Sequence, residues 1–204
     1  MKISPTLTEV KEIAKTGKYD ILPVSCEILS DFITPIEAMR ILQNVSTHCY
    51  LLESAQANEA WGRYTFLGYD PKLEINCIDG HMKLGKLSVE TENPSEYIRQ
   101  ILSEYKSPKF DYLPSFTGGL VGYFSYDYLG YKEKSIRGKA RDTEDFKDVD
   151  LMLFDKVIAF DNLCQKIILI ANMSLDAPET GYNKAIVEIK QLRELLMHGE
   201  KKQN

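Results

Sequence analysis

The sequence predicts an α+β fold built on largely antiparallel β-sheet. Strand-like segments come in pairs joined by short turns, and helix-like segments stand between groups of strands instead of alternating with single strands. The clearest turns are Asp79-Gly80 and Asp161-Asn162, each of which lies between two strand-like runs. Because tight turns join antiparallel neighbours, the strands are expected to pair as hairpins.

Two helices are predicted from their start signals. Thr34 can cap a helix, Pro35 fits its first turn, and Glu37 completes a capping box. This helix is expected to run to about Leu42. Residues 93–96 (NPSE) repeat the same pattern before a second apolar stripe, which predicts another helix there.

Two further helices are predicted from apolar spacing. Pro5 to Lys15 has an apolar face, and Gly17 is placed to end it. The last helix has apolar residues at helical spacing, namely Tyr182, Ala185, Ile186, Ile189, Leu192 and Leu196. Residues 1–198 are therefore expected to form one domain, and residues 199–204 a frayed polar tail.

The strands are predicted from short apolar runs bounded by turn residues. In one of these runs Gly118, Gly119 and Gly122 indicate a bulge, or a place where another backbone or a ligand comes close. The predicted strands are Ile21 to Leu29, Cys49 to Glu53, Tyr64 to Gly68, Leu73 to Ile78, Met82 to Leu87, Gly118 to Tyr126, Leu151 to Phe160 and Lys166 to Ala171.

Composition is typical of a soluble intracellular protein. The chain has 204 residues, of which 44% are hydrophobic, enough to bury one core. No apolar run approaches the ~20 residues that span a bilayer, and the N-terminus lacks a signal-peptide core, so we expect no membrane partner and a cytoplasmic location. A net charge of −5 argues against nucleic acid as a partner. The four cysteines match no zinc spacing and are expected to be free thiols.

Residue patterns typical of catalysis are missing. His48 and Cys49 are neighbours on a predicted strand and would point to opposite faces. Asp148 and Asp150 could share a strand face and hold a metal, but the charged loop beside them favours solvated side chains. The glycines at 118–122 lack the lysine-serine pair of a phosphate loop; they serve either close sheet packing or a ligand. We therefore predict no catalytic residue and no metal site in this chain.

Three segments together resemble a known family. LLES (51–54) is a strand that stops at an acid and a hydroxyl, WGRYTFLG (61–68) begins the next strand, and FTGGLVGYFSYD (116–127) is the glycine-rich run. In this order they closely resemble the N-terminal domain of anthranilate synthase component I. ILPVSCEILSDFITPIEAMRIL (21–42) and DVDLMLFDKVIAFDN (148–162) extend the resemblance over almost the whole chain.

The resemblance implies a fold, an activity and partners. The fold would be a sandwich of antiparallel sheets with helices on the outside. The enzyme converts chorismate to anthranilate and pyruvate, with ammonia from a glutamine amidotransferase subunit, component II. Its catalytic domain, which binds chorismate and Mg²⁺, lies C-terminal to this region and has no counterpart in these 204 residues. The chain alone is therefore expected to be catalytically inactive and to need no cofactor of its own.

A free amino acid needs an acid for its ammonium, donors for its carboxylate and an apolar slot. Glu53 can meet the ammonium, Ser54 can donate or accept, and Arg63 can face the carboxylate. From the residues alone, Glu53 and Ser54 would more simply end a strand at a turn. The resemblance implies that LLES contributes to the site of L-tryptophan, a feedback inhibitor. The ligand-binding residues are thus predicted to be Ser54, Glu53, Arg63, Leu52 and Tyr64.

Two alternatives stay open at this stage. The sister enzyme of folate synthesis, aminodeoxychorismate synthase component I, shares the pattern more loosely, and its N-terminal domain would hold tryptophan as a structural element. A stand-alone module that senses tryptophan or docks the amidotransferase would have the same residues. An open reading frame that continues into a chorismate-binding domain would distinguish a fragment from such a module.

Overall fold

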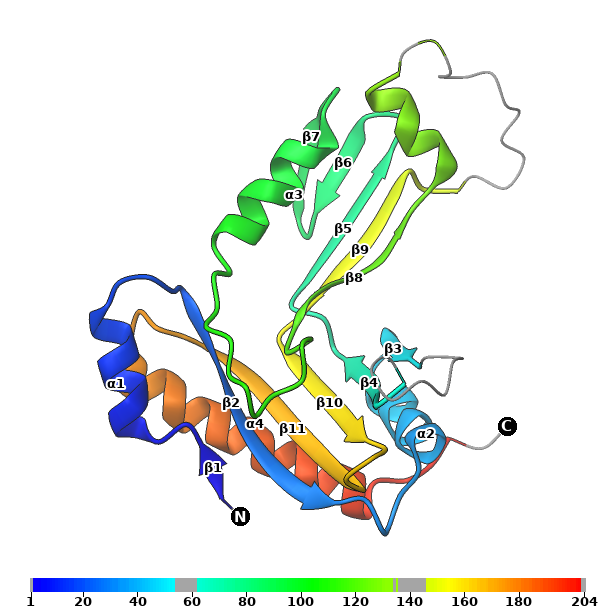
Figure 1. Cartoon of the computed structure of the whole chain (residues 1–204). Helices are drawn as coiled ribbons and strands as arrows, with labels where there is room; N and C mark the ends of the chain where they lie inside the picture. The colour runs from blue at the N-terminus through cyan, green and yellow to red at the C-terminus, as the bar shows by residue number, and fades with distance from the viewer. Residues whose placement is uncertain (1, 54–61, 134, 136–145, 203–204) are drawn as a thin grey trace. The chain divides into compact units, whose positions relative to one another are not determined.

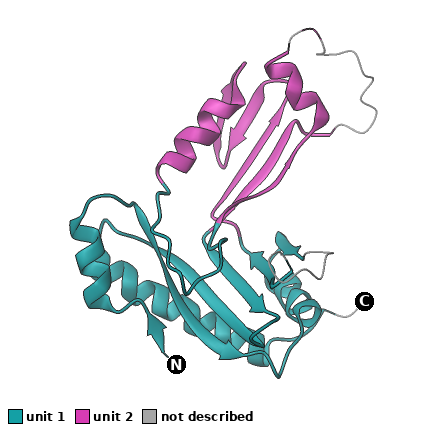
Figure 2. Cartoon of the chain, in the orientation of Figure 1, with its two compact units in different colours: residues 1–70, 105–118, 155–204 teal, residues 71–104, 119–154 magenta. Residues whose placement is uncertain are grey.

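The computed structural model describes residues 2–53, 62–133, 135 and 146–202 (Figure 1). The chain divides into two compact units (Figure 2). Unit 1 comprises residues 1–70, 105–118 and 155–204, and unit 2 comprises residues 71–104 and 119–154. Each unit has one antiparallel sheet with its own hydrophobic cluster, so the predicted α+β class with antiparallel sheets is confirmed.

The sheet of unit 1 has six strands in the order β1-β2-β11-β10-β4-β3. All neighbours are antiparallel. Their bounds are Ile3–Ser4 for β1, Ile21–Leu29 for β2, Cys49–Leu52 for β3, Tyr64–Tyr69 for β4, Lys156–Asp161 for β10 and Lys166–Ser174 for β11. The ends of β3 and β10 and the start of β4 therefore lie at the same end of the sheet.

Three helices cover one face of this sheet, α1 (Leu7–Lys15), α2 (Pro35–Val45) and α4 (Pro178–His198) (Figure 1). The capping box predicted at Thr34 and Glu37 is present, and Thr6 with Glu9 forms a second one before α1. The core beneath the helices includes Val24, Leu42, Leu67, Phe160, Leu169 and Ile189, all buried.

The opposite face of the same sheet carries a smaller apolar cluster. Its buried members are Val157, Ala159, Ile168 and Ile170. The ring side chains of Tyr64 and Phe66 pack against them, as do Leu113 and Phe116 from the segment 105–118. Alternate side chains of β10 and β11 thus pack in two different hydrophobic clusters, one on each face of the sheet. This explains why these strands are apolar at consecutive positions.

Among its described residues, unit 2 has five strands in the order β7-β6-β5-β9-β8, one α-helix and one 3₁₀-helix. Ile98 of the α-helix packs on the sheet residues Ile75, Cys77, Met82, Val149 and Leu151. The bounds are Leu73–Ile78 for β5, His81–Leu84 for β6, Leu87–Glu90 for β7, Gly119–Phe124 for β8, Val149–Phe154 for β9, Pro94–Ser103 for α3 and Tyr126–Tyr131 for η1.

Two predicted strands are each divided in the structure. The run from Met82 to Leu87 becomes β6 and β7, because Gly85 turns with a φ of 59°. The run from Leu151 to Phe160 becomes β9 and β10, which belong to different sheets and different units. The charged residues Asp155 and Lys156 interrupt this run where the two strands divide, but they do not reveal that its two halves pack in separate cores.

The segment after α4 differs from the predicted frayed tail. The backbone N–H of Lys202 donates to the carbonyl of Arg40 over 3.1 Å, and Asn44 donates to the carbonyl of Glu200 over 2.5 Å. Lys201 pairs with Glu37. Residues 199–202 therefore lie along α2, tied to it by hydrogen bonds that a polar sequence alone does not indicate.

Candidate functional site

The predicted site residues gather where β3 ends and β4 begins, at one end of the unit 1 sheet. Glu53 directly follows β3, and Arg63 directly precedes β4. β10 ends at Asp161, opposite Tyr64 of β4. Ser54 lies outside the described residues.

Arg63 forms a two-point ion pair with Asp161. Its Nε donates to Oδ1 over 3.1 Å, and its Nη2 donates to Oδ2 over 2.6 Å. The Asp161 side chain is only 4% exposed, whereas that of Arg63 is 38% exposed. The backbone N–H groups of Leu163 and Cys164 also donate to Oδ1 of Asp161. The aspartate is thus a buried anchor, and the arginine reaches from it toward solvent.

The electrostatics of the pair agree with this geometry. Burial alone would raise the pKa of the Asp161 carboxyl, but the hydrogen bonds from Arg63 and Cys164 outweigh it and hold that pKa below its usual value. The hydrogen bond with Asp161 in turn raises the pKa of the Arg63 guanidinium. Both side chains are therefore charged at neutral pH.

A second set of contacts links Glu53 to the same strand end. The hydroxyl of the fully buried Thr65 donates to Oε1 of Glu53 over 3.5 Å, and Asn162 donates to that hydroxyl over 3.2 Å. The backbone N–H of Asn162 donates to the carbonyl of Arg63 over 2.8 Å. We call Glu53, Arg63, Thr65, Asp161 and Asn162 the polar cluster.

The apolar residues predicted for the site lie beside Arg63 on the face opposite the helices. The Arg63 guanidinium carbon lies 4.9 Å from the centre of the Tyr64 ring. Leu52 is 45% exposed and pairs with Phe66, whose ring centre lies 5.8 Å from that of Tyr64. Leu52, Arg63 and Tyr64 are thus brought to one face of the strand end.

Glu53 reaches toward the other face. It contacts Thr65, which pairs with Phe160 of the helix-covered core. The predicted acid and the predicted aromatic wall therefore share a strand end but not a sheet face.

Three members of the polar cluster were not predicted from the sequence: Thr65, Asp161 and Asn162. Asp161-Asn162 was interpreted only as a hairpin turn, which it is, between β10 and β11. A usable signal is present in the sequence, because the acid Asp161 ends an apolar strand just as the acid Glu53 follows the apolar residues Leu51 and Leu52.

The glycine-rich strand β8 and the two aspartates near it have structural roles. A Cβ on Gly122 would lie 2.0 Å from the carbonyl oxygen of Asp150, which favours close sheet packing at that position. Asp148 is 9% exposed and accepts hydrogen bonds from Tyr131 and from the backbone of Asp79, so its expected solvation is corrected. Asp150 pairs with Lys147 over 2.9 Å.

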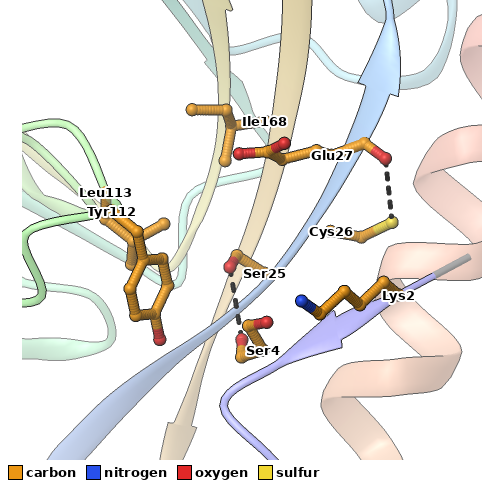
Figure 3. A pocket seen from close by; sticks show the side chains of 8 residues that line it. All are labelled: Lys2, Ser4, Ser25, Cys26, Glu27, Tyr112, Leu113 and Ile168. Atoms are coloured by element: carbon orange, nitrogen blue, oxygen red, sulfur yellow. Dashed lines mark hydrogen bonds between the residues drawn. The ribbon is translucent and has the colours of Figure 1, made fainter.

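A cavity of about 420 Å³ lies on unit 1 (Figure 3). Ser25 lies at its floor and donates to the carbonyl of Ser4 over 3.2 Å, while Glu27 on its wall pairs with Lys166. None of the described residues among the predicted ligand residues, which are Glu53, Arg63, Leu52 and Tyr64, lines it. The lining residues are Lys2, Ser4, Ser25, Cys26, Glu27, Tyr112, Leu113 and Ile168.

Neither a metal cluster nor a membrane helix is found in the described part of the chain. No three His, Cys, Asp or Glu side chains there come together as metal ligands. Among the same residues, no helix combines the length and apolar character that crossing a bilayer requires.

Two known proteins that are similar to this chain in sequence have the same name. No family model matches the sequence. "Anthranilate synthase component 1" of Acetivibrio thermocellus is 34% identical over 198 residues, which cover 94% of this chain and 39% of that protein. The protein of the same name in Pseudomonas aeruginosa is 35% identical, over 92% of this chain and 39% of its own length. The chain thus spans about two fifths of the length of these relatives.

The fold agrees with the sequence comparison. The crystal structure of anthranilate synthase component I from Streptococcus pneumoniae TIGR4 matches with a TM-score of 0.52 and 25% identity. The match covers 81% of this chain and 36% of that protein. The predicted resemblance is confirmed, and over most of its length this chain is a relative of anthranilate synthase component I.

Proposed function

We propose that this chain is the regulatory part of an anthranilate synthase component I, and that it contributes the site where L-tryptophan binds as a feedback inhibitor. The observation that carries the proposal is the place of Arg63. Its guanidinium lies over Tyr64 at the strand end that follows LLES, in a chain related to component I over 94% of its length.

The strand end offers the three kinds of group that a free amino acid needs. Arg63 supplies donors for the carboxylate. Leu52 and Tyr64 supply an apolar and aromatic wall for an indole. Glu53 contacts Thr65 on the other sheet face, but it is exposed and its only described hydrogen bond, to Thr65, is long at 3.5 Å. We propose that it leaves this contact and turns around the strand end to meet the ammonium.

The regulatory mechanism would be allosteric. In the proposed enzyme a catalytic part binds chorismate and Mg²⁺ and forms anthranilate and pyruvate, with ammonia from the amidotransferase, component II. Tryptophan at the β3–β4 end would favour the state in which that part cannot close productively. Inhibition then follows from the higher affinity of tryptophan for that state. Such an enzyme would act in the cytoplasm, in tryptophan biosynthesis.

Calorimetric titration of the chain with L-tryptophan tests the proposal. Saturable binding is expected for the unchanged chain, and Ser54→Phe is expected to abolish it by filling the predicted pocket. Ser103→Phe, at the exposed end of α3 in unit 2, is the matched control and is expected to bind normally. A chain that binds no tryptophan contradicts the proposal, and equal binding by Ser54→Phe removes Ser54 from the site.

An activity assay extends the test to regulation. In a component I polypeptide that makes anthranilate, Ser54→Phe should remove inhibition by tryptophan and leave turnover largely unchanged. Superimposed inhibition curves for variant and parent would contradict the assignment of this site as the regulatory one.

A further inference from the structure

We infer that Asp161 is a positioning residue for the ligand carboxylate. It holds the Arg63 guanidinium at the start of β4 through Nε and Nη2, and the ligand carboxylate would accept from Nη1. This inference rests on the proposed function, because it assigns Arg63 to the carboxylate of a bound amino acid. It adds a residue that lies 98 positions away in the sequence and that would not itself touch the ligand.

The donors of Arg63 divide into two groups. A guanidinium has five N–H donors. Nε and Nη2 each donate to Asp161, and Nη2 also donates to the sulfur of Cys164 over 3.6 Å. Within the described residues, no acceptor is found for Nη1. One edge of the group is thus fixed to the protein, and we assign the two N–H donors of Nη1 to the ligand carboxylate.

Asp161 is itself held by several hydrogen bonds. Asp161 is buried and its Oδ1 accepts from two backbone N–H groups at the β10–β11 turn, in addition to Arg63. The backbone of Arg63 is held from the same turn, because the N–H of Asn162 donates to its carbonyl. Both the main chain and the side chain of Arg63 are therefore fixed by the end of one neighbouring strand.

This anchoring favours binding by lowering its entropic cost. An unanchored arginine has many rotamers, and immobilising such a side chain on binding opposes affinity. Asp161 has already restricted those rotamers, and it also cancels the charge of Arg63. The free edge therefore suits a hydrogen-bonded carboxylate of a zwitterion better than a strongly charged anion such as a phosphate.

Three ligands separate the contribution of the carboxylate from that of the rest of the molecule. L-tryptophan has both charged groups, tryptamine lacks the carboxylate, and indole-3-propionate lacks the ammonium. Asp161→Asn keeps the oxygen that caps the turn but loses the charge that fixes Arg63. This variant is expected to bind tryptophan and indole-3-propionate about tenfold more weakly than the parent, and to bind tryptamine with unchanged affinity.

Two more variants complete the test. Arg63→Gln should show the same ligand pattern, and the double variant should bind tryptophan no more weakly than Arg63→Gln alone, because both act through one group. Glu27→Gln is the matched control. It removes the Lys166 pair, which joins β2 to β11 and involves no member of the polar cluster, and it should change none of the three affinities.

A spectroscopic readout reports on the orientation of Arg63 without any ligand. The Nη2 protons of Arg63 donate to Oδ2 of Asp161 and should give a slowly exchanging NMR signal in the unchanged chain. Asp161→Asn should lose this signal, because it replaces Oδ2 with an amide that donates and cannot accept. This inference is overturned, while the proposed function stands, if Asp161→Asn binds tryptophan as tightly as the parent does. It is also overturned if the variant loses as much affinity for tryptamine as for tryptophan. If the unchanged chain binds neither tryptophan nor tryptamine, the proposed function and this inference are both overturned.

Discussion

Arg63 donates two hydrogen bonds to the buried carboxylate of Asp161, although 98 positions separate the two residues along the chain. The pair joins the start of β4 to the end of β10. Because the aspartate is buried and the arginine is partly exposed, the contact is an anchored ion pair and not two independent surface charges.

Replacing Arg63 with Ala should destabilise unit 1 by about 1–2 kcal/mol, because the buried carboxylate of Asp161 loses its charged partner. The figure lies below that of a fully buried pair, since solvent already screens the exposed part of the guanidinium. Amide hydrogen exchange measures the effect, with faster exchange expected in β10 and β4. Amides of β5 in unit 2 are the internal control.

A matched variant tests whether the loss of any ion pair from this sheet would have the same effect on exchange. Lys166→Ala removes an exposed pair with Glu27 from the neighbouring strand β11 and should leave exchange unchanged. Equal effects of the two substitutions would contradict a special role for the Arg63–Asp161 pair.

The same pair predicts a pH dependence of stability. The folded pKa of Asp161 is lowered relative to an unfolded value of about 3.9, so its contribution to stability is fully present above that value. As the pH falls through the folded pKa, protonation removes the contribution. The difference in unfolding free energy between the parent and Asp161→Asn should be constant from about pH 7 to 5 and should shrink below about pH 4. Urea unfolding at a series of pH values measures it, and a difference that grows toward acid would be contrary to the assigned charge state.

Much of the fold follows from local signals in the sequence. The helix α2 begins where Thr34, Pro35 and Glu37 predict it, because a capping box depends on only four neighbouring residues. The strand β2 has its predicted bounds, Ile21 to Leu29, and the Asp79-Gly80 turn joins β5 to β6.

The rest depends on distant packing, which local patterns do not report. The chain passes from the sheet of unit 2 to that of unit 1 at Asp155. The charged pair of Asp155 and Lys156 interrupts the apolar run there, but a two-residue interruption does not show that the chain changes sheet. The partner of Arg63 is set by the pairing of β10 with β4, so the sequence could mark Asp161 as an acid at the end of a strand but could not show that it holds Arg63. The sequence also placed Glu53 and Tyr64 in one site without showing that they lie toward different sheet faces.

In unit 2, Tyr131→Phe should destabilise the β5–β6 turn by about 1–2 kcal/mol. The Tyr131 hydroxyl donates to Asp148 over 2.6 Å and accepts from the backbone N–H of Gly80 over 2.7 Å. Burial, together with the hydrogen bonds to Asp148 and Cys77, raises the pKa of this hydroxyl, which therefore stays protonated as a donor. Its loss leaves a partly buried carboxylate oxygen and an N–H group without this partner.

Hydrogen exchange at the amides of Asp79 and Gly80 measures this effect. Tyr126→Phe is the matched control on the same 3₁₀-helix, because its side chain is 79% exposed, and it should leave those amides unchanged. Unchanged protection of the turn in Tyr131→Phe would show that the hydroxyl does not hold it.

Gly122→Ala should be among the most damaging single substitutions in unit 2. Gly122 lies in β8 opposite Leu151 of β9, with a φ of 151° that L-residues rarely adopt. A Cβ there would lie 2.0 Å from the Asp150 carbonyl oxygen and 2.9 Å from the Leu151 Cα. Neither backbone atom can move without breaking the β8–β9 pairing, so a loss of about 3 kcal/mol is expected.

Gly17→Ala is the control that distinguishes the cost of steric collision from the cost of backbone strain. Gly17 also has a positive φ, 62°, but nothing lies within 4 Å of its Cβ position. Its cost should be about 1 kcal/mol, from strain alone. Unfolding in urea, followed by amide signals of β8 and β9 for Gly122 and of α1 for Gly17, measures both. Equal costs for the two variants would mean that strand β8 can shift away from β9, and that the glycine is needed for its conformation and not for close packing.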